Sequence, residues 1–181
     1  MKTPEQRYLD LLVKTLSFSL WPNPPVPMEM FDYTRTPIKR KIISLVSTLI
    51  RPYKMKLVHD QNFNEDEVLE GKTWPGYADS MIGVKRLNNV KECAELAIQQ
   101  HIPGDFIETG VWRGGACILM RAVLAAYQIQ DRRVFAADSF QGLPAPDLSK
   151  YPKDKDSQFH THPYLAVSQE EVARNFSRYD L

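Results

Sequence analysis

The stretch that decides the fold is Asp105–Ile118, which reads D-F-I-E-T-G-V-W-R-G-G-A-C-I. It opens with the apolar pair Phe106–Ile107 directly after a Pro-Gly dipeptide, which predicts the start of a buried strand. A glycine-rich turn follows, and then Ala116–Ile129, a run of strong helix formers. Strand, glycine turn and helix in this order are typical of a nucleotide-binding crossover unit, in which glycines let the backbone approach a ligand. The start of the helix is expected to add free N–H groups and the positive end of its dipole.

A second strand, predicted over Arg133–Ala137, ends in Asp138. An acid at the end of the second strand of such a unit commonly accepts hydrogen bonds from ribose hydroxyls. The glycine spacing is G-x-x-x-G-G, not the G-x-G-x-x-G of dinucleotide sites, and Glu108 stands two residues before the first glycine. We therefore predict a ribose-containing ligand, and S-adenosylmethionine (SAM) in preference to a dinucleotide.

Composition narrows the class of protein. The chain has 181 residues, a formal net charge of +1 and no global basic character that would suggest nucleic-acid binding. Glu5, Arg7 and Asp10 interrupt any apolar run near the N-terminus, which argues against a signal peptide, and no stretch reaches the roughly 18 apolar residues of a membrane span. We expect a cytoplasmic protein without integral membrane segments, with Cys93 and Cys117 as reduced core thiols.

Residues 1–79 are predicted to form an N-terminal helical extension with a lid region. The leucine spacing predicts a helix over Glu5–Trp21, and a proline cluster then forces an extended linker. The segment from Tyr33 to His59 contains no acid, and a short apolar helix is predicted within it over Ile42–Ile50. Its basic residues are Arg35, Lys39, Arg40, Lys41, Arg51, Lys54 and Lys56. This segment is either an accessory helix with solvated lysines, which we favour, or an element that meets a membrane surface or an anionic partner.

An acidic stretch precedes the part that carries the glycine turn. Gln61–Gly71 is predicted to be a short helix and Lys72–Asp79 a loop, because Trp74-Pro75-Gly76 is a turn signal. Trp74 has two interpretations that the sequence leaves open, one as part of a lid and one as a surface residue that closes the edge of the core.

Residues 80–181 are predicted to be the first part of a Rossmann-like α/β domain. A helix over Val84–Gln100 precedes the first strand and should cover the sheet. Ser139–Pro146 forms a tight loop at the carboxyl end of the second strand, where open α/β sheets hold ligands. Asp147–Pro163 is predicted to be a long mobile segment, and its two histidines are interpreted as solvated because no third metal ligand is spaced for them. A capping box at Ser168–Glu171 opens a final helix.

Only two parallel strands are predicted, whereas a doubly wound sheet needs roughly five or more. Two strands would leave unpaired edges and an uncovered apolar face. The expectation is that the missing strands come either from a partner chain or from further residues of a longer protein, of which this would be the front part; we favour the second.

Two sequence blocks are specific in type and order, E-T-G-V-W-R-G-G at Glu108–Gly115 and D-S-F-Q-G-L-P at Asp138–Pro144. Shorter matching blocks occur along nearly the whole chain, at Arg7–Leu12, Gly71–Pro75, Ser80–Asn89 and Val167–Phe176. With these blocks the chain resembles the N-terminal part of the TylF/MycF (macrocin O-methyltransferase) family of SAM-dependent O-methyltransferases.

The resemblance implies a class I methyltransferase fold, present here as its first two parallel strands and flanking helices behind an N-terminal helical extension. It also implies that SAM lies across the glycine turn. The residues expected to contact SAM are Met81, Glu108, Thr109, Gly110, Gly114, Asp138 and Ser139. Family members methylate a sugar hydroxyl of a natural product, with magnesium holding vicinal oxygens and an acid removing the proton.

The family's metal ligands and base are aspartates in blocks that resemble L-D-G-D and I-D-D-Y, and neither block occurs in these 181 residues. We therefore name no catalytic residue and no metal ligand, and we expect little turnover from this chain alone. The alternative function is a non-catalytic module that binds SAM or a partner chain. The expected partners are a small-molecule hydroxyl acceptor and a second copy of the chain, paired through the N-terminal helices.

Overall fold

The computed structural model describes residues 1–28, 35–60, 64–73 and 75–181. The chain forms two compact units. The first comprises Met1–Trp21, Phe63–Gly142 and Leu165–Leu181, and the second comprises Pro22–Asn62 and Leu143–Tyr164. This division differs from the predicted boundary between residues 79 and 80, because the N-terminal helix packs within the first unit.

Three helices form the core of the first unit: α1 (Pro4–Leu16), α4 (Gly83–Gln99) and α5 (Gly115–Ala126). Their facing side chains are buried together, as the apolar spacing in the sequence predicted. The cluster contains Leu9, Leu12, Val13, Leu16, Leu87, Ala94, Ile118, Leu119, Ala122 and Val123. The N-terminal helix is thus part of the domain core, because it contributes four of these residues.

The first helix is shorter than predicted. It ends at Leu16 instead of continuing to Trp21, because Phe18 adopts a left-handed backbone conformation (φ 58°). The carbonyl of Leu16 then accepts hydrogen bonds from the backbone N–H groups of Asp79 (2.9 Å) and Ser80 (3.0 Å). The end of α1 therefore fixes the loop that leads to α4.

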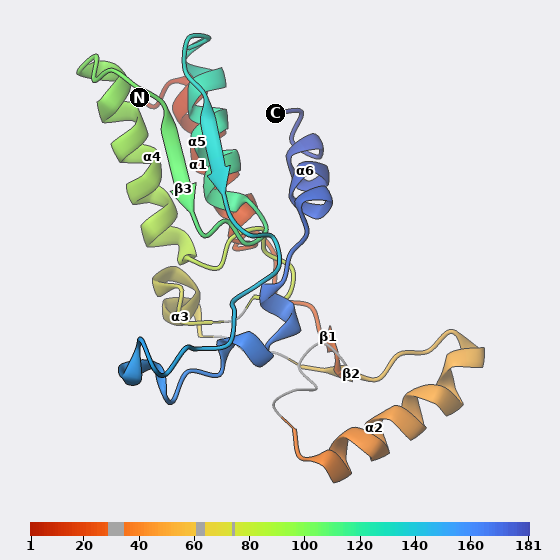
Figure 1. Cartoon of the computed structure of the whole chain (residues 1–181). Helices are drawn as coiled ribbons and strands as arrows, with labels where there is room; N and C mark the ends of the chain where they lie inside the picture. Colours follow the sequence, from red (N-terminus) through yellow and green to blue (C-terminus); the bar gives the residue numbers. More distant parts are fainter. Residues whose placement is uncertain (29–34, 61–63, 74) are drawn as a thin grey trace. The chain divides into compact units, whose positions relative to one another are not determined.

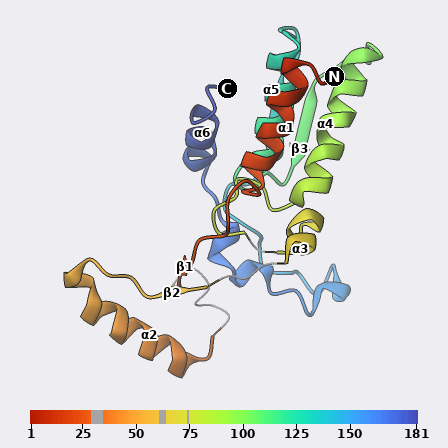
Figure 2. The ribbon, with the colours of Figure 1, turned by 180° about the vertical axis from the view of Figure 1, so that it is seen from behind.

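Two parallel strands, β3 (Phe106–Thr109) and β4 (Val134–Ala137), confirm the predicted pair. Their register pairs Phe106 with Val134 and Thr109 with Ala137. Alternate residues face α5, which lies behind the strands in Figure 1 and on the viewer's side of them in Figure 2. On the other face Ile107 is 63% and Phe135 46% exposed, so within the described residues this apolar face is uncovered.

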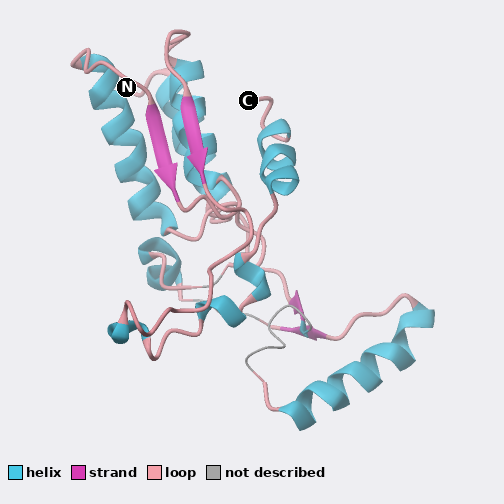
Figure 3. Cartoon of the chain, in the orientation of Figure 1, coloured by secondary structure: helices cyan, strands magenta, loops and turns pink. Residues whose placement is uncertain are grey.

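Two shorter helices complete the first unit (Figure 3). Helix α3 (Glu65–Glu70) lies inside the helix predicted over Gln61–Gly71 and packs on α4. Residues 61–63 lie outside the described ranges. Trp74 also lies outside them, so neither of its two interpretations is tested. Helix α6 (Gln169–Ser177) starts at Ser168, whose hydroxyl accepts a hydrogen bond from the Glu171 N–H (3.2 Å), the first half of the predicted capping box.

The second unit contains α2 (Pro37–Ile50), which continues as a 3₁₀ turn over Arg51–Tyr53. Proline fits the first turn of a helix, so α2 starts five residues before the predicted Ile42. A short antiparallel pair joins β1 (Val26–Pro27), inside the predicted proline linker, to β2 (Val58–His59). The segment Asp147–Pro163, predicted to be long and mobile, contains the 3₁₀ turns Pro152–Asp154 and Phe159–Thr161, and the turn Pro163–Leu165 follows.

One further prediction needs correction. Cys117 is buried in α5 as expected, but Cys93 is exposed, because it lies on the outer face of α4. Both thiols are free. No helix in the described ranges combines the length and the apolar content that a membrane crossing requires.

Candidate functional site

The glycine turn (residues 110–115) joins the carboxyl end of β3 to the start of α5. Gly110 and Gly114 have positive φ angles, 92° and 90°, and so does Trp112 at 49°. The turn is closed by a hydrogen bond from the Gly114 N–H to the Val111 carbonyl (2.9 Å). It is tied to the neighbouring strand by the Gly110 N–H, which donates to the Ala137 carbonyl (3.0 Å).

The three glycines of the turn are required for different reasons. A Cβ at Gly110 would meet no atom within 4 Å, so the space beside this residue is open. A Cβ at Gly114 would lie 3.1 Å from Cγ1 of Val172 on α6, and a Cβ at Gly115 only 2.5 Å from the Asp79 carbonyl oxygen. Close approach of a ligand to the backbone is therefore available at Gly110, whereas the side-chain space of Gly114 and Gly115 is filled by the protein.

The start of α5 is partly occupied, contrary to the expectation of free N–H groups there. The Gly115 N–H donates to the Asp79 carbonyl (3.0 Å). The Glu108 carboxylate accepts a hydrogen bond from the Cys117 thiol (3.0 Å) and a further one from the Cys117 backbone N–H. Glu108 thus acts as the anion at this helix N-terminus and links the end of β3 to α5.

Burial dominates the electrostatics of Glu108 and Cys117. Partial burial raises the pKa of Glu108, the hydrogen bonds from Cys117 oppose that rise, and the nearby charge of Asp138 adds to it. Burial also raises the pKa of the Cys117 thiol, and the hydrogen bond to Glu108 raises it further. Cys117 is therefore a neutral donor at physiological pH and not a nucleophile.

Asp138, at the end of β4, is held across the turn by backbone groups. Its two carboxylate oxygens accept hydrogen bonds from the N–H groups of Val111 (2.6 Å) and Phe140 (2.9 Å). Burial works against its charge, but the backbone N–H groups of Phe140, Val111, Trp112 and Ser139 outweigh burial and lower its pKa. Asp138 is therefore a fixed and ionised acceptor at the carboxyl end of β4.

The other predicted contacts differ in their exposure to solvent. Ser139 is exposed; its hydroxyl accepts from the Gln141 N–H (3.2 Å) and donates to the Gly142 carbonyl (3.2 Å), which shapes the loop after β4. Thr109 is exposed at the end of β3, and Met81 is half-buried in the loop before α4. The structure therefore brings Glu108, Gly110 and Asp138 together at the carboxyl edge of the sheet, and their roles in binding stay a prediction.

Sequence reasoning missed two residues that hold the turn. The Arg113 guanidinium donates to the carbonyls of Gly76 (3.0 Å) and Ala78 (2.8 Å). The Asn175 side-chain amide, on α6, donates to the Arg113 carbonyl (3.0 Å). The arginine of the W-R-G-G block was visible in the sequence, but nothing there indicated which backbone groups it would bind.

Metal binding has no support in the described part of the chain. No group of three or more His, Cys, Asp or Glu side chains there could hold a metal ion. The residues described do not fit the magnesium site that the resemblance implies, and we derive no step through a metal.

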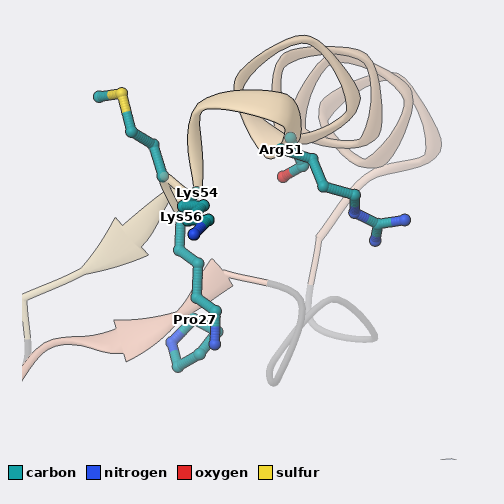
Figure 4. A pocket seen from close by; sticks show the side chains of 6 residues that line it. Pro27, Arg51, Lys54 and Lys56 are labelled. Atoms are coloured by element: carbon teal, nitrogen blue, oxygen red, sulfur yellow. The ribbon is translucent and has the colours of Figure 1, made fainter.

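A cavity of about 410 Å³ lies in the second unit, at the end of α2 (Figure 4). Its lining residues are Pro27, Ser47, Arg51, Lys54, Met55 and Lys56. Figure 4 shows that the Arg51 side chain points away from Lys54 and Lys56.

Comparison with known proteins gives one family and several relatives. The family model of the macrocin-O-methyltransferases (TylF) matches residues 5–181. Demethyldecarbamoylnovobiocin O-methyltransferase of Streptomyces niveus is 41% identical over 175 residues, which is 96% of this chain and 57% of that protein. Mycinamicin III 3''-O-methyltransferase of Micromonospora griseorubida is 45% identical over 128 residues, 69% of this chain and 50% of that protein.

A solved structure agrees with these relatives. The O-methyltransferase NovP superposes with a TM-score of 0.75 at 39% identity, over 98% of this chain and 60% of that chain. The chain thus spans between half and three fifths of the length of the relatives it matches.

Proposed function

The chain belongs to the macrocin-O-methyltransferase (TylF) family, and on this premise we propose that it carries the SAM-binding part of an enzyme that methylates a hydroxyl, preferentially a sugar hydroxyl, of a small natural product. The observation that carries the proposal is the pair formed by Gly110 and Asp138. Open space beside a glycine and a fixed carboxylate lie at the carboxyl ends of adjacent parallel strands, where α/β sheets hold nucleosides.

Three of the predicted contacts have distinct tasks in this proposal. Asp138 accepts hydrogen bonds from the ribose hydroxyls, and Gly110 lets the backbone lie against the ligand. Glu108 orients the end of β3 through its bonds to Cys117. Further contacts with SAM are proposed for Met81, Thr109, Gly114 and Ser139. SAM, when bound, supplies an electrophilic methyl group on a sulfonium, and the chain's task is to hold and orient it.

The acceptor and the chemical step are proposed to need residues beyond these 181. Two observations support this: the described strands leave Ile107 and Phe135 exposed on an apolar face, and the novobiocin relative is matched over 57% of its length. We propose that this class I methyltransferase fold is incomplete. Further strands would extend the sheet at its edges and bring the magnesium ligands and the base, and the helices that connect them would cover this face. A methyl-transfer assay with magnesium and a panel of glycosylated acceptors tests this, and robust turnover by the 181 residues alone would contradict it.

The uncovered face also favours the second candidate function, a module that binds SAM or a partner chain without catalysis. Micromolar SAM binding without methyl transfer by the 181 residues would support it, whereas no binding by a molten chain would indicate a mere fragment. A cytoplasmic location and pairing of two copies through the N-terminal helices stay proposals as well. Because Leu9 and its neighbours pack inside the core, pairing through α1 would have to use its outer residues Tyr8 and Leu11.

The proposed cofactor role is tested by titration calorimetry with SAM. We expect micromolar binding by the wild-type chain and at least tenfold weaker binding by Asp138→Asn, because the amide has lost the charge and one acceptor oxygen. Asp156→Asn, an exposed acid in the second unit, is the matched control and should bind normally. A folded wild-type chain that does not bind SAM would refute the proposal.

A further inference from the structure

Arg113 lies in the middle of the glycine turn and contacts two other segments of the chain. One nitrogen of its guanidinium, Nη1, carries two N–H groups, and these reach the carbonyls of Gly76 (3.0 Å) and Ala78 (2.8 Å). The guanidinium also lies over the ring of Trp112, 4.4 Å from its centre. The side chain thus fixes the turn to the loop of residues 75–80, which leads to Met81.

Helix α6 holds the same residue from its main-chain side. The Asn175 amide donates to the Arg113 carbonyl (3.0 Å), and its own oxygen accepts from Arg178 (3.1 Å). Asn175 is only 2% exposed. A buried amide is costly unless its hydrogen bonds are made, so this residue is explained by the bond to the turn.

A third contact joins the end of α6 to the loop of residues 75–80. The Tyr179 hydroxyl, just beyond α6, donates to the Asp79 carboxylate (2.6 Å), and the Asp79 carbonyl accepts from the Gly115 N–H (3.0 Å). The turn, the loop of residues 75–80 and α6 are therefore joined pairwise, with Arg113 bound to both of the other two segments.

This arrangement controls the geometry of the proposed cofactor site. Val111, two residues before Arg113, donates the short hydrogen bond that holds the Asp138 carboxylate (2.6 Å). A shift of the turn would move this donor and Gly110 together, and binding sites lose function when their groups move by about 1 Å.

We propose that Arg113 is a positioning residue for the cofactor: it holds the glycine turn so that Gly110 and Asp138 keep the geometry that binds SAM, and Asn175 secures the turn from the other side. The inference rests on the proposed function for the identity of the ligand. The positioning of the turn itself is observable without any ligand.

The test compares Arg113→Ala, Arg113→Lys and Asn175→Ala with Arg121→Ala, a basic residue of α5 outside the arrangement. SAM affinity is measured by calorimetry at a temperature where circular dichroism shows each variant folded. The expected result is a dissociation constant raised about tenfold for Arg113→Ala and Asn175→Ala, less for Arg113→Lys, and unchanged for Arg121→Ala. Unchanged affinity in Arg113→Ala, with only a lower melting temperature, would show a purely structural role and overturn the inference.

Amide hydrogen exchange separates this inference from the proposed function. If Arg113 positions the turn, exchange at residues 110–115 is faster in Arg113→Ala than in the wild type and unchanged in Arg121→Ala. A wild-type chain that does not bind SAM refutes the proposed function. In that case the exchange rates at residues 110–115 still show whether Arg113 positions the turn. Equal exchange in wild type and Arg113→Ala overturns that role.

Discussion

Alanine at Gly110 and alanine at Gly115 are expected to damage the protein in opposite ways, although the two glycines belong to one turn. Gly110 has φ 92° and open space where a Cβ would lie. Its replacement adds only backbone strain of about 1–2 kcal/mol. That cost is small against the roughly 5–15 kcal/mol that stabilises a typical domain, so the variant should fold.

Gly115 presents the reverse case, because its φ is ordinary but its side-chain space is filled. A Cβ would lie 2.5 Å from the Asp79 carbonyl oxygen and 2.6 Å from the Ser80 Cβ. The loop must move, and the hydrogen bond from the Gly115 N–H to Asp79 (3.0 Å) is weakened or lost. Overpacking and the lost bond together are expected to cost about 2–4 kcal/mol.

The order of the variants by SAM affinity should differ from their order by stability. In Gly110→Ala the new methyl group projects into the space proposed for SAM, so binding falls by at least tenfold while the fold remains. Gly104→Ala is the matched control, because Gly104 also has a positive φ (110°) and open space but lies before β3, at its opposite end from the turn. It should lose similar stability and keep normal SAM affinity.

Urea unfolding followed by circular dichroism measures the stabilities, and calorimetry measures the affinities. Two results would refute the reasoning. One is Gly115→Ala as stable as Gly110→Ala, which would mean that the contact with Asp79 is not tight. The other is equal loss of SAM affinity in Gly104→Ala and Gly110→Ala, which would mean that the space beside Gly110 is not the binding site.

Three further predictions concern charge and reactivity. Because the pKa of Asp138 is lowered in the folded state, its stabilisation is present above the usual value of 3.8 and is lost as the pH falls through the folded value. Asp138→Asn should therefore be about 1–3 kcal/mol less stable than wild type at pH 7, with a difference that shrinks in acid; a constant difference would contradict this. The pKa of Glu108 is raised, so its contribution is greatest below the usual 4.5 and is lost as the pH rises. Urea unfolding should therefore show that the stability of Glu108→Gln rises relative to that of the wild type as the pH increases above 4.5. Finally, a thiol reagent should modify the exposed Cys93 in the native protein and Cys117 only after unfolding, and fast modification of both would show that α5 is not packed as described.

Local sequence features predicted a large part of the fold because they act over short distances. The apolar spacing of α1 and α4 appears directly as buried faces, and the order of strand, glycine turn, helix and strand appears as the parallel pair β3 and β4. Asp138 was proposed as a site residue from its position at a strand end, and its role in binding stays a prediction. The family resemblance, carried by the blocks around Glu108 and Asp138, is confirmed by the match over residues 5–181.

Element ends and exposure were less predictable, because they depend on contacts between distant segments. The helix α1 stops at Leu16, where its last carbonyl binds the loop at Asp79 and Ser80. Cys93 had the same residue type and helical setting as Cys117, yet only the packing of α4 decides that it faces outward.

The amino-acid sequence by itself determined the class of fold, the turn and the acid that mark the proposed cofactor site, because glycine spacing and hydrophobic periodicity are properties of neighbouring residues. Only the tertiary structure decided what each glycine does. Gly110 is open, whereas Gly114 and Gly115 are filled by α6 and by the loop at Asp79. It also revealed that Arg113 joins the turn to segments more than thirty residues away on each side, at Gly76 and at Asn175. Such contacts arise from long-range packing, and no local pattern of residues encodes them.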